Sequence, residues 1–283
     1  MNKIARHLLL LTLPALARAQ TVSPIQSAAD PFGLAIVDKV RLAGSDAAGT
    51  SFQAGVLPSI TDLVNLNLKE TVSLKNVSSE LLDPSLLNLA TNSTVRVYFI
   101  GEGAGYHNTL AFSYVTANAP ATATPIAANI NSQTQLIFPD ASSSVSTYDP
   151  ASTAVRTSAN PLLPGDFVDL GKFTSAGRLD LTLISNGANG GKDAFVASAA
   201  QNVDKINHVV AFAMKNSPFL IVAFEDLKGG GDKDYNDVVV AVDVGRANVS
   251  HMVSGPTPPL ALTLPSLLGL AAWFRRRQAA LAA

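Results

Sequence analysis

The chain has 283 residues, of which 47% are hydrophobic and 14% are charged, and it contains no cysteine. Disulfide bonds therefore cannot stabilise it, so its stability depends on a hydrophobic core or on a bound metal. The two ends, residues 1–19 and 256–283, hold six of the 20 lysines and arginines, which leaves 14 basic against 21 acidic residues in the body, a formal charge of −7. Such a body argues against nucleic acids and anionic membrane surfaces as partners, because both require a basic surface.

The first 19 residues have the pattern of a secretory signal peptide. Lys3 and Arg6 precede a short apolar run, and Ala17 and Ala19 form the small-residue cleavage signal. The apolar run is shorter than the roughly 20 residues that a membrane-spanning helix requires. We therefore expect cleavage after Ala19 and export of the mature chain to the periplasm, the outer surface or the medium.

Residues 20–93 follow as an N-terminal segment without a clean hydrophobic period. Alternation in part of the segment predicts β-rich or mixed structure, with a helix around residues 78–90.

From residue 94 the pattern is that of a β domain, which we place at residues 94–250. Short β-branched and aromatic runs recur between Gly-, Asn- and Pro-rich turns, and residues 139–166 form a Ser- and Pro-rich insert. This spacing predicts an all-β fold, a β-sandwich or jelly roll. The expected strands are 94–100, 109–115, 134–138, 167–173, 178–185, 208–215, 218–225 and 237–244, the first two forming a hairpin through a Gly-rich loop.

An acidic loop separates the last two expected strands. Both strands are continuous apolar runs, so both are expected to be buried, and the loop between them leaves and re-enters the core at one edge. Alternation of Asp232, Asp234 and Asn236 would point these side chains to one side of an extended or gently curved backbone. Six oxygen-bearing side chains are therefore expected near a common point: Glu225, Asp226, Asp232, Asp234, Asn236 and Asp237.

This loop predicts a Ca²⁺ site. Calcium takes six to eight oxygen ligands, some from backbone carbonyls, and Gly229–Gly231 would let the backbone turn carbonyls inward. The pattern is not an EF-hand, because Asp237 stands where that loop has glycine and a strand follows. Zinc is disfavoured because no Cys or close His is present, and the alternative of a solvated acidic turn stays open.

Three further polar groups are weaker candidates for a site. The loop at residues 101–108 could lie beside the acidic loop and form a glycan- or peptide-binding end of the sandwich. Two other sets of polar residues could supply a second cation site, Asp166 with Asp169, and Asn186 with Asn189 and Asp193.

The C-terminal residues 256–283 have the order of a membrane anchor. Pro256 and Pro258 precede an apolar segment with Trp273, and a basic cluster of Arg275, Arg276 and Arg277 follows. This order resembles the PEP-CTERM sorting tail of Gram-negative secreted proteins. The resemblance implies a short hydrophobic helix in the inner membrane and removal by an exosortase-like enzyme, although Thr257 replaces the usual glutamate.

The acidic loop also resembles the signature of a bacterial secreted family, the domain of unknown function 4114. The matching residues are Phe224–Leu227, Gly229–Gly231 and Asp232–Asp237, and the resemblance extends over residues 94–245. It implies a β-rich module of exported proteins.

Taken together, these patterns favour an exported, non-catalytic β-sandwich protein of the cell envelope or extracellular matrix that binds Ca²⁺. The alternative is a calcium-dependent carbohydrate-binding or adhesive module with extracellular polysaccharide as partner. A secreted hydrolase is the least favoured function, because its general acid would need an apolar pocket that raises the pKa of one carboxylate.

Overall fold

The computed structural model describes residues 26–68, 81–90, 92–116, 123–146, 155–214 and 216–254. The predicted signal peptide and the predicted C-terminal anchor lie outside these residues. Within them, no helix combines the length and the apolar character that crossing a bilayer requires.

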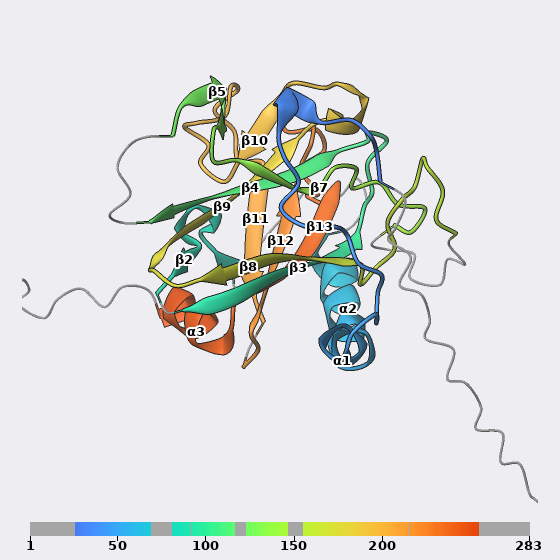
Figure 1. The fold of residues 1–283 in the computed structure, drawn as a ribbon, viewed down its shortest axis with the longest axis vertical. Helices are drawn as coiled ribbons and strands as arrows, with labels where there is room; N and C mark the ends of the chain where they lie inside the picture. The colour runs from blue at the N-terminus through green and yellow to red at the C-terminus, as the bar shows by residue number, and fades with distance from the viewer. Residues whose placement is uncertain are drawn as a thin grey trace, which may run out of the picture.

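The described chain forms a sandwich of two antiparallel sheets, which confirms the predicted all-β class (Figure 1). The larger sheet has the order β1 (Leu81–Leu82), β11 (Val209–Ala213), β12 (Phe219–Phe224), β13 (Val238–Asp243), β3 (Ser93–Gly101) and β8 (Phe167–Phe173). The smaller sheet has the order β10 (Ala194–Val196), β9 (Gly177–Ile184), β4 (Thr109–Thr116) and β7 (Gln135–Phe138), and β2 (Asn88–Leu89) pairs with β9. A separate hairpin joins β5 (Pro125–Ala127) to β6 (Ile130–Asn131).

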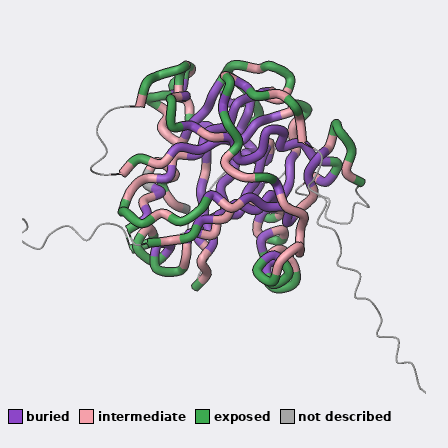
Figure 2. Tube along the Cα trace, viewed as in Figure 1, coloured by how far each residue is buried: buried purple, intermediate pink, exposed green. Residues whose placement is uncertain are grey.

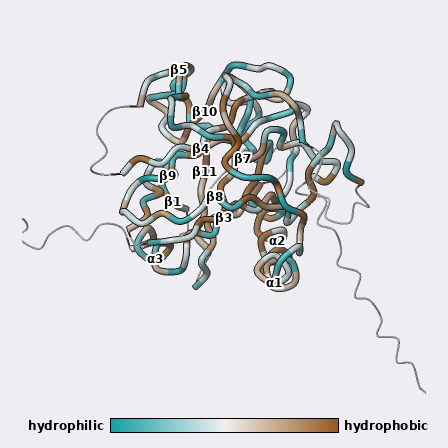
Figure 3. The backbone as a smooth tube through the Cα atoms, viewed as in Figure 1, coloured by the Kyte–Doolittle hydropathy of each residue, from teal (hydrophilic) through white to brown (hydrophobic). Residues whose placement is uncertain are grey.

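The main core lies between the two sheets and follows the two-residue period of the strands. Phe99 of β3 and Val240 of β13 meet Leu110 of β4 and Leu181 of β9 in one buried cluster. Buried residues accordingly concentrate in the centre of the molecule (Figure 2), and the same strands are strongly hydrophobic (Figure 3).

Two helices cover the outer face of the larger sheet, so its central strands are buried on both faces. They are α1 (Ala47–Gly55) and α2 (Leu57–Asn67). Phe52 of α1 stacks on Tyr98 of β3 with ring centroids 3.8 Å apart, and Ile60 of α2 belongs to the same cluster as Ile221 of β12. Burial on both faces explains why β12 and β13 are continuous apolar runs instead of alternating ones.

The sequence analysis missed these helices and placed one where none forms. Asp46 begins α1 by accepting a hydrogen bond from the Gly49 N–H (2.6 Å), a capping signal that lies before a weakly periodic run. The helix predicted around residues 78–90 is wrong in its described part, residues 81–90. That part contains β1, the 3-10 helix η2 (Pro84–Leu86) and β2, because Pro84 interrupts a continuous α-helix.

Three short helices complete the fold. Two are the 3-10 helices η1 (Pro31–Gly33) and η3 (Gly187–Asn189), and the third is α3 (Arg246–Ser254). Val249 of α3 packs into the main core.

The predicted hairpin of residues 94–100 and 109–115 is also wrong. β3 pairs with β13 and β8 in the larger sheet, whereas β4 pairs with β9 and β7 in the smaller one. Their connection, residues 102–108, crosses from one sheet to the other. Local sequence does not distinguish a crossing from a hairpin, because two successive apolar strands can bury their side chains in the shared core either within one sheet or across two packed sheets. This crossing brings the connection to the end of the sandwich that carries the acidic loop.

Candidate metal centre

The acidic loop joins β12 to β13, the two central strands of the larger sheet, as predicted. Phe224 and Val238 close the ladder between these strands, and both are fully buried. Residues 225–237 therefore leave and re-enter the sheet at one point, which fixes the two ends of the loop beside each other.

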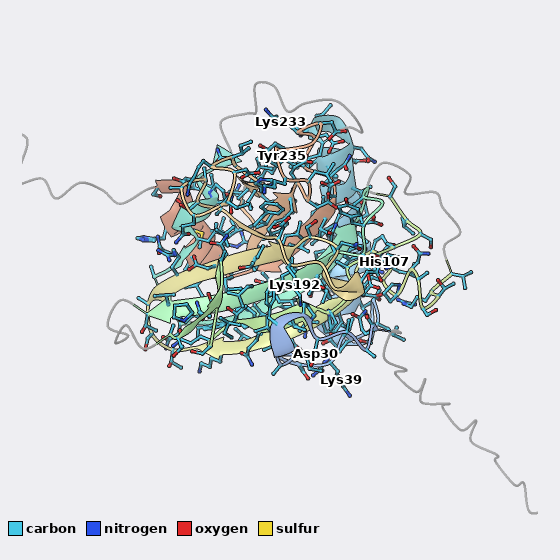
Figure 4. All side chains as sticks on the ribbon, turned by 90° about the horizontal axis from the view of Figure 1, so that it is seen from above. Asp30, Lys39, His107, Lys192, Lys233 and Tyr235 are labelled. Atoms are coloured by element: carbon cyan, nitrogen blue, oxygen red, sulfur yellow. The ribbon has the colours of Figure 1, made fainter. Side chains whose placement is uncertain are left out.

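The loop backbone is tightly curled instead of extended. Lys233 and Tyr235, labelled in Figure 4, have φ values of 61° and 57°, so the predicted extended alternation does not orient the acidic side chains. Gly231 also has a positive φ of 40°, and a Cβ atom there would overlap Glu225 Oε1. Glycine at 231 therefore serves both the turn and the close approach of the Glu225 carboxylate to the backbone.

The five loop carboxylates form two overlapping groups. One oxygen each of Glu225, Asp226 and Asp237 lie within 4.8 Å of one another, and the same holds for Glu225, Asp232 and Asp234. Glu225, Asp226 and Asp234 are at most 3% exposed. These groups could hold a metal ion, and Glu225 is common to both.

Asn236, the sixth predicted residue, lies at the edge of this cluster. It is buried, and its Nδ2 donates a hydrogen bond to Asp234 Oδ2 at 2.9 Å. Its amide therefore orients the Asp234 carboxylate within the described structure.

Burial of like charges raises the pKa of several carboxyl groups in the loop. Burial, reinforced by the charges of Asp232 and Asp234, raises the pKa of Glu225 to about 7. Burial likewise raises the pKa of Asp226 and, together with the Asp226 charge, that of Asp237. The loop therefore strongly favours a state in which protons or a cation neutralise part of its charge.

His208 lies outside the loop, immediately before β11, and supports the loop from there. The fully buried ring stacks on Phe195, with Nδ1 2.9 Å from the Glu225 carbonyl oxygen and Nε2 2.9 Å from Asp204 Oδ2. Asp204 Oδ2 also accepts a hydrogen bond from the Gly229 N–H (2.8 Å). Both ring nitrogens thus face acceptors, so the imidazole donates both bonds only when it carries both protons.

The carboxylate of Asp204 supplies a negative charge beside His208. Burial raises its pKa, but hydrogen bonds from the Gly229 N–H and from His208 outweigh that effect and lower the pKa to about 2. Asp204 therefore stays ionised and ties residue 229 of the loop to the segment before β11. Sequence reasoning missed this residue because it lies 21 residues before the cluster, inside a turn.

The connection at residues 101–108 contacts the acidic loop, as its sequence suggested. Asn108 Nδ2 donates a hydrogen bond to Asp226 Oδ2 at 2.7 Å, and both side chains are buried. Glu102, on the same connection, is 6% exposed, and burial raises its pKa to about 8, with the charges of Asp226 and Asp140 adding to the effect. The site is therefore built from the acidic loop of the larger sheet and the connection that crosses between the two sheets.

A cavity of about 450 Å³ opens between these two connections. Gly103–Tyr106 form one wall, with Tyr106 41% exposed, and the other wall includes Glu225, Asp226, Leu227 and Asp232. An aromatic ring and an aliphatic side chain thus flank the carboxylate cluster.

Residues 173–245 match the family model described as a domain of unknown function (DUF4114). This segment of the chain is similar to the DUF4114 domain. The match confirms the predicted family, over a shorter range than the predicted 94–245, and it contains β9 to β13 and the entire acidic loop. Searches of curated proteins and of solved structures gave no match.

The residues that complete the site lie partly outside the matched DUF4114 segment. Asn108 precedes that segment by more than sixty residues, yet it contacts Asp226 directly. The DUF4114 loop is therefore supported by strands β3 and β4, which precede the matched range.

The other predicted cation groups have different partners. Arg156 contacts Asp166 at 2.5 Å and Arg96 contacts Asp169 at 2.6 Å, so both carboxylates are neutralised by arginine. Asn186 accepts hydrogen bonds from the His107 N–H and from Asn189 Nδ2. These groups connect parts of the fold to one another.

The raised pKa values predict how the metal-free protein responds to pH. A carboxyl whose pKa is raised on folding binds a proton in the native state after the unfolded state has lost it, so the unfolding free energy falls as pH rises. For Glu225 this window runs from 4.5 to about 7, and for Glu102 it ends at about 8. In chelator, chemical denaturation of the full chain should give a lower unfolding free energy at pH 8 than at pH 5.

Two variants isolate the contribution of the loop to this pH dependence. Asp237→Asn should reduce the fall in unfolding free energy between pH 5 and pH 8, because it removes one carboxyl group from the cluster. Asp62→Asn, on the exposed surface of α2, should preserve that fall. An identical fall in wild type and Asp237→Asn would contradict this account of the cluster.

Proposed function

We propose that this protein is an exported, non-catalytic β-sandwich protein of the cell envelope or extracellular matrix that binds Ca²⁺ in the loop of residues 225–237. The observation that carries the proposal is the burial of Glu225, Asp226 and Asp234, with Asp232 and Asp237 within reach in two groups that share Glu225. Among the described residues, no lysine or arginine forms an ion pair with Glu225, Asp226 or Asp237. A divalent cation would supply the missing positive charge.

The ligand set favours calcium over zinc and magnesium. All five acidic side chains offer hard oxygen atoms, and the positive φ values of Gly229–Gly231 would let the backbone turn carbonyl groups toward an ion, in keeping with the six to eight oxygen ligands of Ca²⁺. Zinc prefers imidazole or thiolate ligands, and both nitrogens of His208, the nearest histidine, already face Glu225 and Asp204. Magnesium usually retains several waters and uses fewer protein carboxylates.

The bound ion would stabilise the fold. It would offset the repulsion between the loop carboxylates and hold β12 and β13 together at their common end. Because ligands must be ionised, binding would also displace the protons that the raised pKa values retain. Glu225, Asp226 and Asp234 are buried, as the general acid of a hydrolase would need to be, but a cation in the cluster would occupy the carboxylates that such chemistry requires.

A second candidate function is calcium-dependent binding of carbohydrate, favoured by the cavity beside the loop. Tyr106 and Leu227 are 41% and 43% exposed on its two walls, so they offer apolar surface to the ring of a sugar. A calcium ion at Glu225 and Asp232 would lie on the floor, where vicinal sugar hydroxyls could complete its coordination.

Export and membrane attachment are supported by the sequence of the two ends. The leader ending at Ala19 and the tail with Arg275–Arg277 have the order of a signal peptide and a sorting anchor. Cells that produce the full chain should contain it in the membrane fraction, and a chain ending at residue 255 should appear in the soluble or secreted fraction. Equal fractionation of the two chains would contradict the anchor.

The calcium proposal predicts a metal-dependent melting temperature. Calcium at ~100 times its Kd should add about 2.7 kcal/mol to the unfolding free energy of the full chain, and an equal concentration of Mg²⁺ should add less. The double variant Asp232→Ala, Asp234→Ala should lose the calcium-dependent increase, whereas Asp62→Ala should retain it. The effect of calcium is the difference between the melting temperatures of the same variant with calcium and with chelator. A general loss of stability in that variant lowers both temperatures and therefore does not change the difference. A wild-type protein that melts at the same temperature in both conditions would exclude the site.

The carbohydrate candidate predicts a different pattern. Tyr106→Ala should abolish glycan retention on a polysaccharide column while the calcium-dependent increase in melting temperature persists, because Tyr106 lines the cavity but offers no carboxylate. The matched control is Tyr114→Ala, whose side chain lies at the opposite end of β4 and packs against Phe173. Retention that is equal with calcium and with chelator would rule out a calcium-bridged glycan.

A further inference from the structure

A polar groove crosses the outer face of the smaller sheet, away from the acidic loop. It has a volume of about 580 Å³, within the range of roughly 300–1,000 Å³ that small-molecule sites occupy. Its floor is the pair of strands β4 and β9. Residues of the β5–β6 hairpin form one wall, and Val196–Ser198 with Gln201 form part of the other.

The floor presents hydroxyl groups that the fold itself does not use. Ser113 of β4 and Thr182 of β9 line the groove and are 6% and 2% exposed. Neither hydroxyl makes a hydrogen bond to another residue in the described part of the chain, and neither oxygen is one of the fully buried atoms that lack a partner there. Both oxygens are therefore accessible from the groove and provide donors and acceptors for a ligand.

The residues that line the groove carry no net charge. Its two charged lining residues are Arg178 and Asp180, which form a bidentate pair at 2.5 and 2.8 Å on the floor beside Ser113. A balanced lining does not favour phosphate groups, nucleic acids or free cations. It suits a neutral ligand that is rich in hydroxyl groups, because the pair offers donors and acceptors side by side.

Hydrogen bonds hold both walls of the groove. Asn129 Nδ2 donates to the Ala194 carbonyl oxygen at 2.7 Å and so ties the β5–β6 hairpin to β10. Asn202 exchanges two hydrogen bonds of 2.9 Å with the backbone of Val196, which holds the opposite wall. Such fixed walls make the groove pre-formed, and a pre-formed groove loses little entropy on binding.

The groove continues into a second cavity. This neighbouring cavity, of about 530 Å³, shares Ser85, Ala197 and Ser198 with the first and runs between η2 and the start of β11. Because the two cavities share these residues, a linear ligand could extend from one into the other, and we call the pair the channel. The floor is a sheet face and not an edge, so peptide binding by strand addition is not available there.

We propose that this groove binds a neutral, linear oligosaccharide segment, with Ser113, Thr182 and the Arg178–Asp180 pair hydrogen-bonding its hydroxyl groups. This site is independent of calcium and separate from the cavity at Tyr106.

The test uses the full chain in chelator, so that the acidic loop does not contribute. Neutral gluco-, manno-, galacto- and N-acetylglucosamine oligosaccharides are screened on an array, and bound members are titrated by calorimetry. At least one should bind, and Ser113→Ala with Thr182→Val should weaken it about tenfold by removing two hydrogen-bonding hydroxyls. Ser198→Trp should block the channel where the two cavities meet. Thr94→Val, a matched change at an exposed position of β3, should leave affinity unchanged.

Three results would overturn the proposal. The first is that none of these oligosaccharides binds in chelator. The second is binding that survives both Ser198→Trp and the double hydroxyl variant in proteins with wild-type melting temperatures. The third is displacement of the glycan from an unaltered groove by short neutral peptides with higher affinity, which would assign the channel to peptides. Oligosaccharide binding, the effect of the variants and competition by peptides are all measured in chelator, so failure of the calcium site would leave them unchanged.

Discussion

The repulsion between buried carboxylates at the end of β12 and β13 is the constraint on which the account of this protein depends. These strands are the centre of the larger sheet, enclosed by the smaller sheet on one face and by α1 and α2 on the other. Their ladder brings residues 225 and 237 together, and with them a cluster of like charges that burial cannot accommodate in fully ionised form. Packing of β12 and β13 in the hydrophobic core thus brings like charges together at the end of these strands.

The surrounding residues offset only part of the repulsion between these carboxylates. Asn108 donates a hydrogen bond to Asp226 from the connection between the sheets, and His208 with Asp204 fixes the Glu225 carbonyl and the backbone at Gly229. These contacts place the carboxylates without supplying a lysine or arginine to Glu225, Asp226 or Asp237 within the described residues. A site that is rigidly built and short of positive charge is what a structural cation site requires.

The sequence predicted the parts that depend on local pattern. Continuous apolar runs identified β12 and β13, and the dense acidic residues between them identified the loop. The crossing from β3 to β4 was not predictable, because two successive apolar strands can bury their side chains equally well in a hairpin or in a crossing between two sheets. Asp204 and His208 were missed because their role depends on tertiary contacts. α1 was missed because Asp46 caps a helix whose apolar residues, such as Phe52, are too few for a clear period.

The most direct test of the central claim is calorimetric titration of the full chain with Ca²⁺ in buffers of different ionisation enthalpy. If calcium binds the cluster, it must displace the protons held by groups such as Glu225, whose pKa is about 7 in the absence of metal. The account predicts saturable binding with proton release that is larger at pH 6 than at pH 9. Absence of binding, or binding that releases no protons at pH 6, would contradict it.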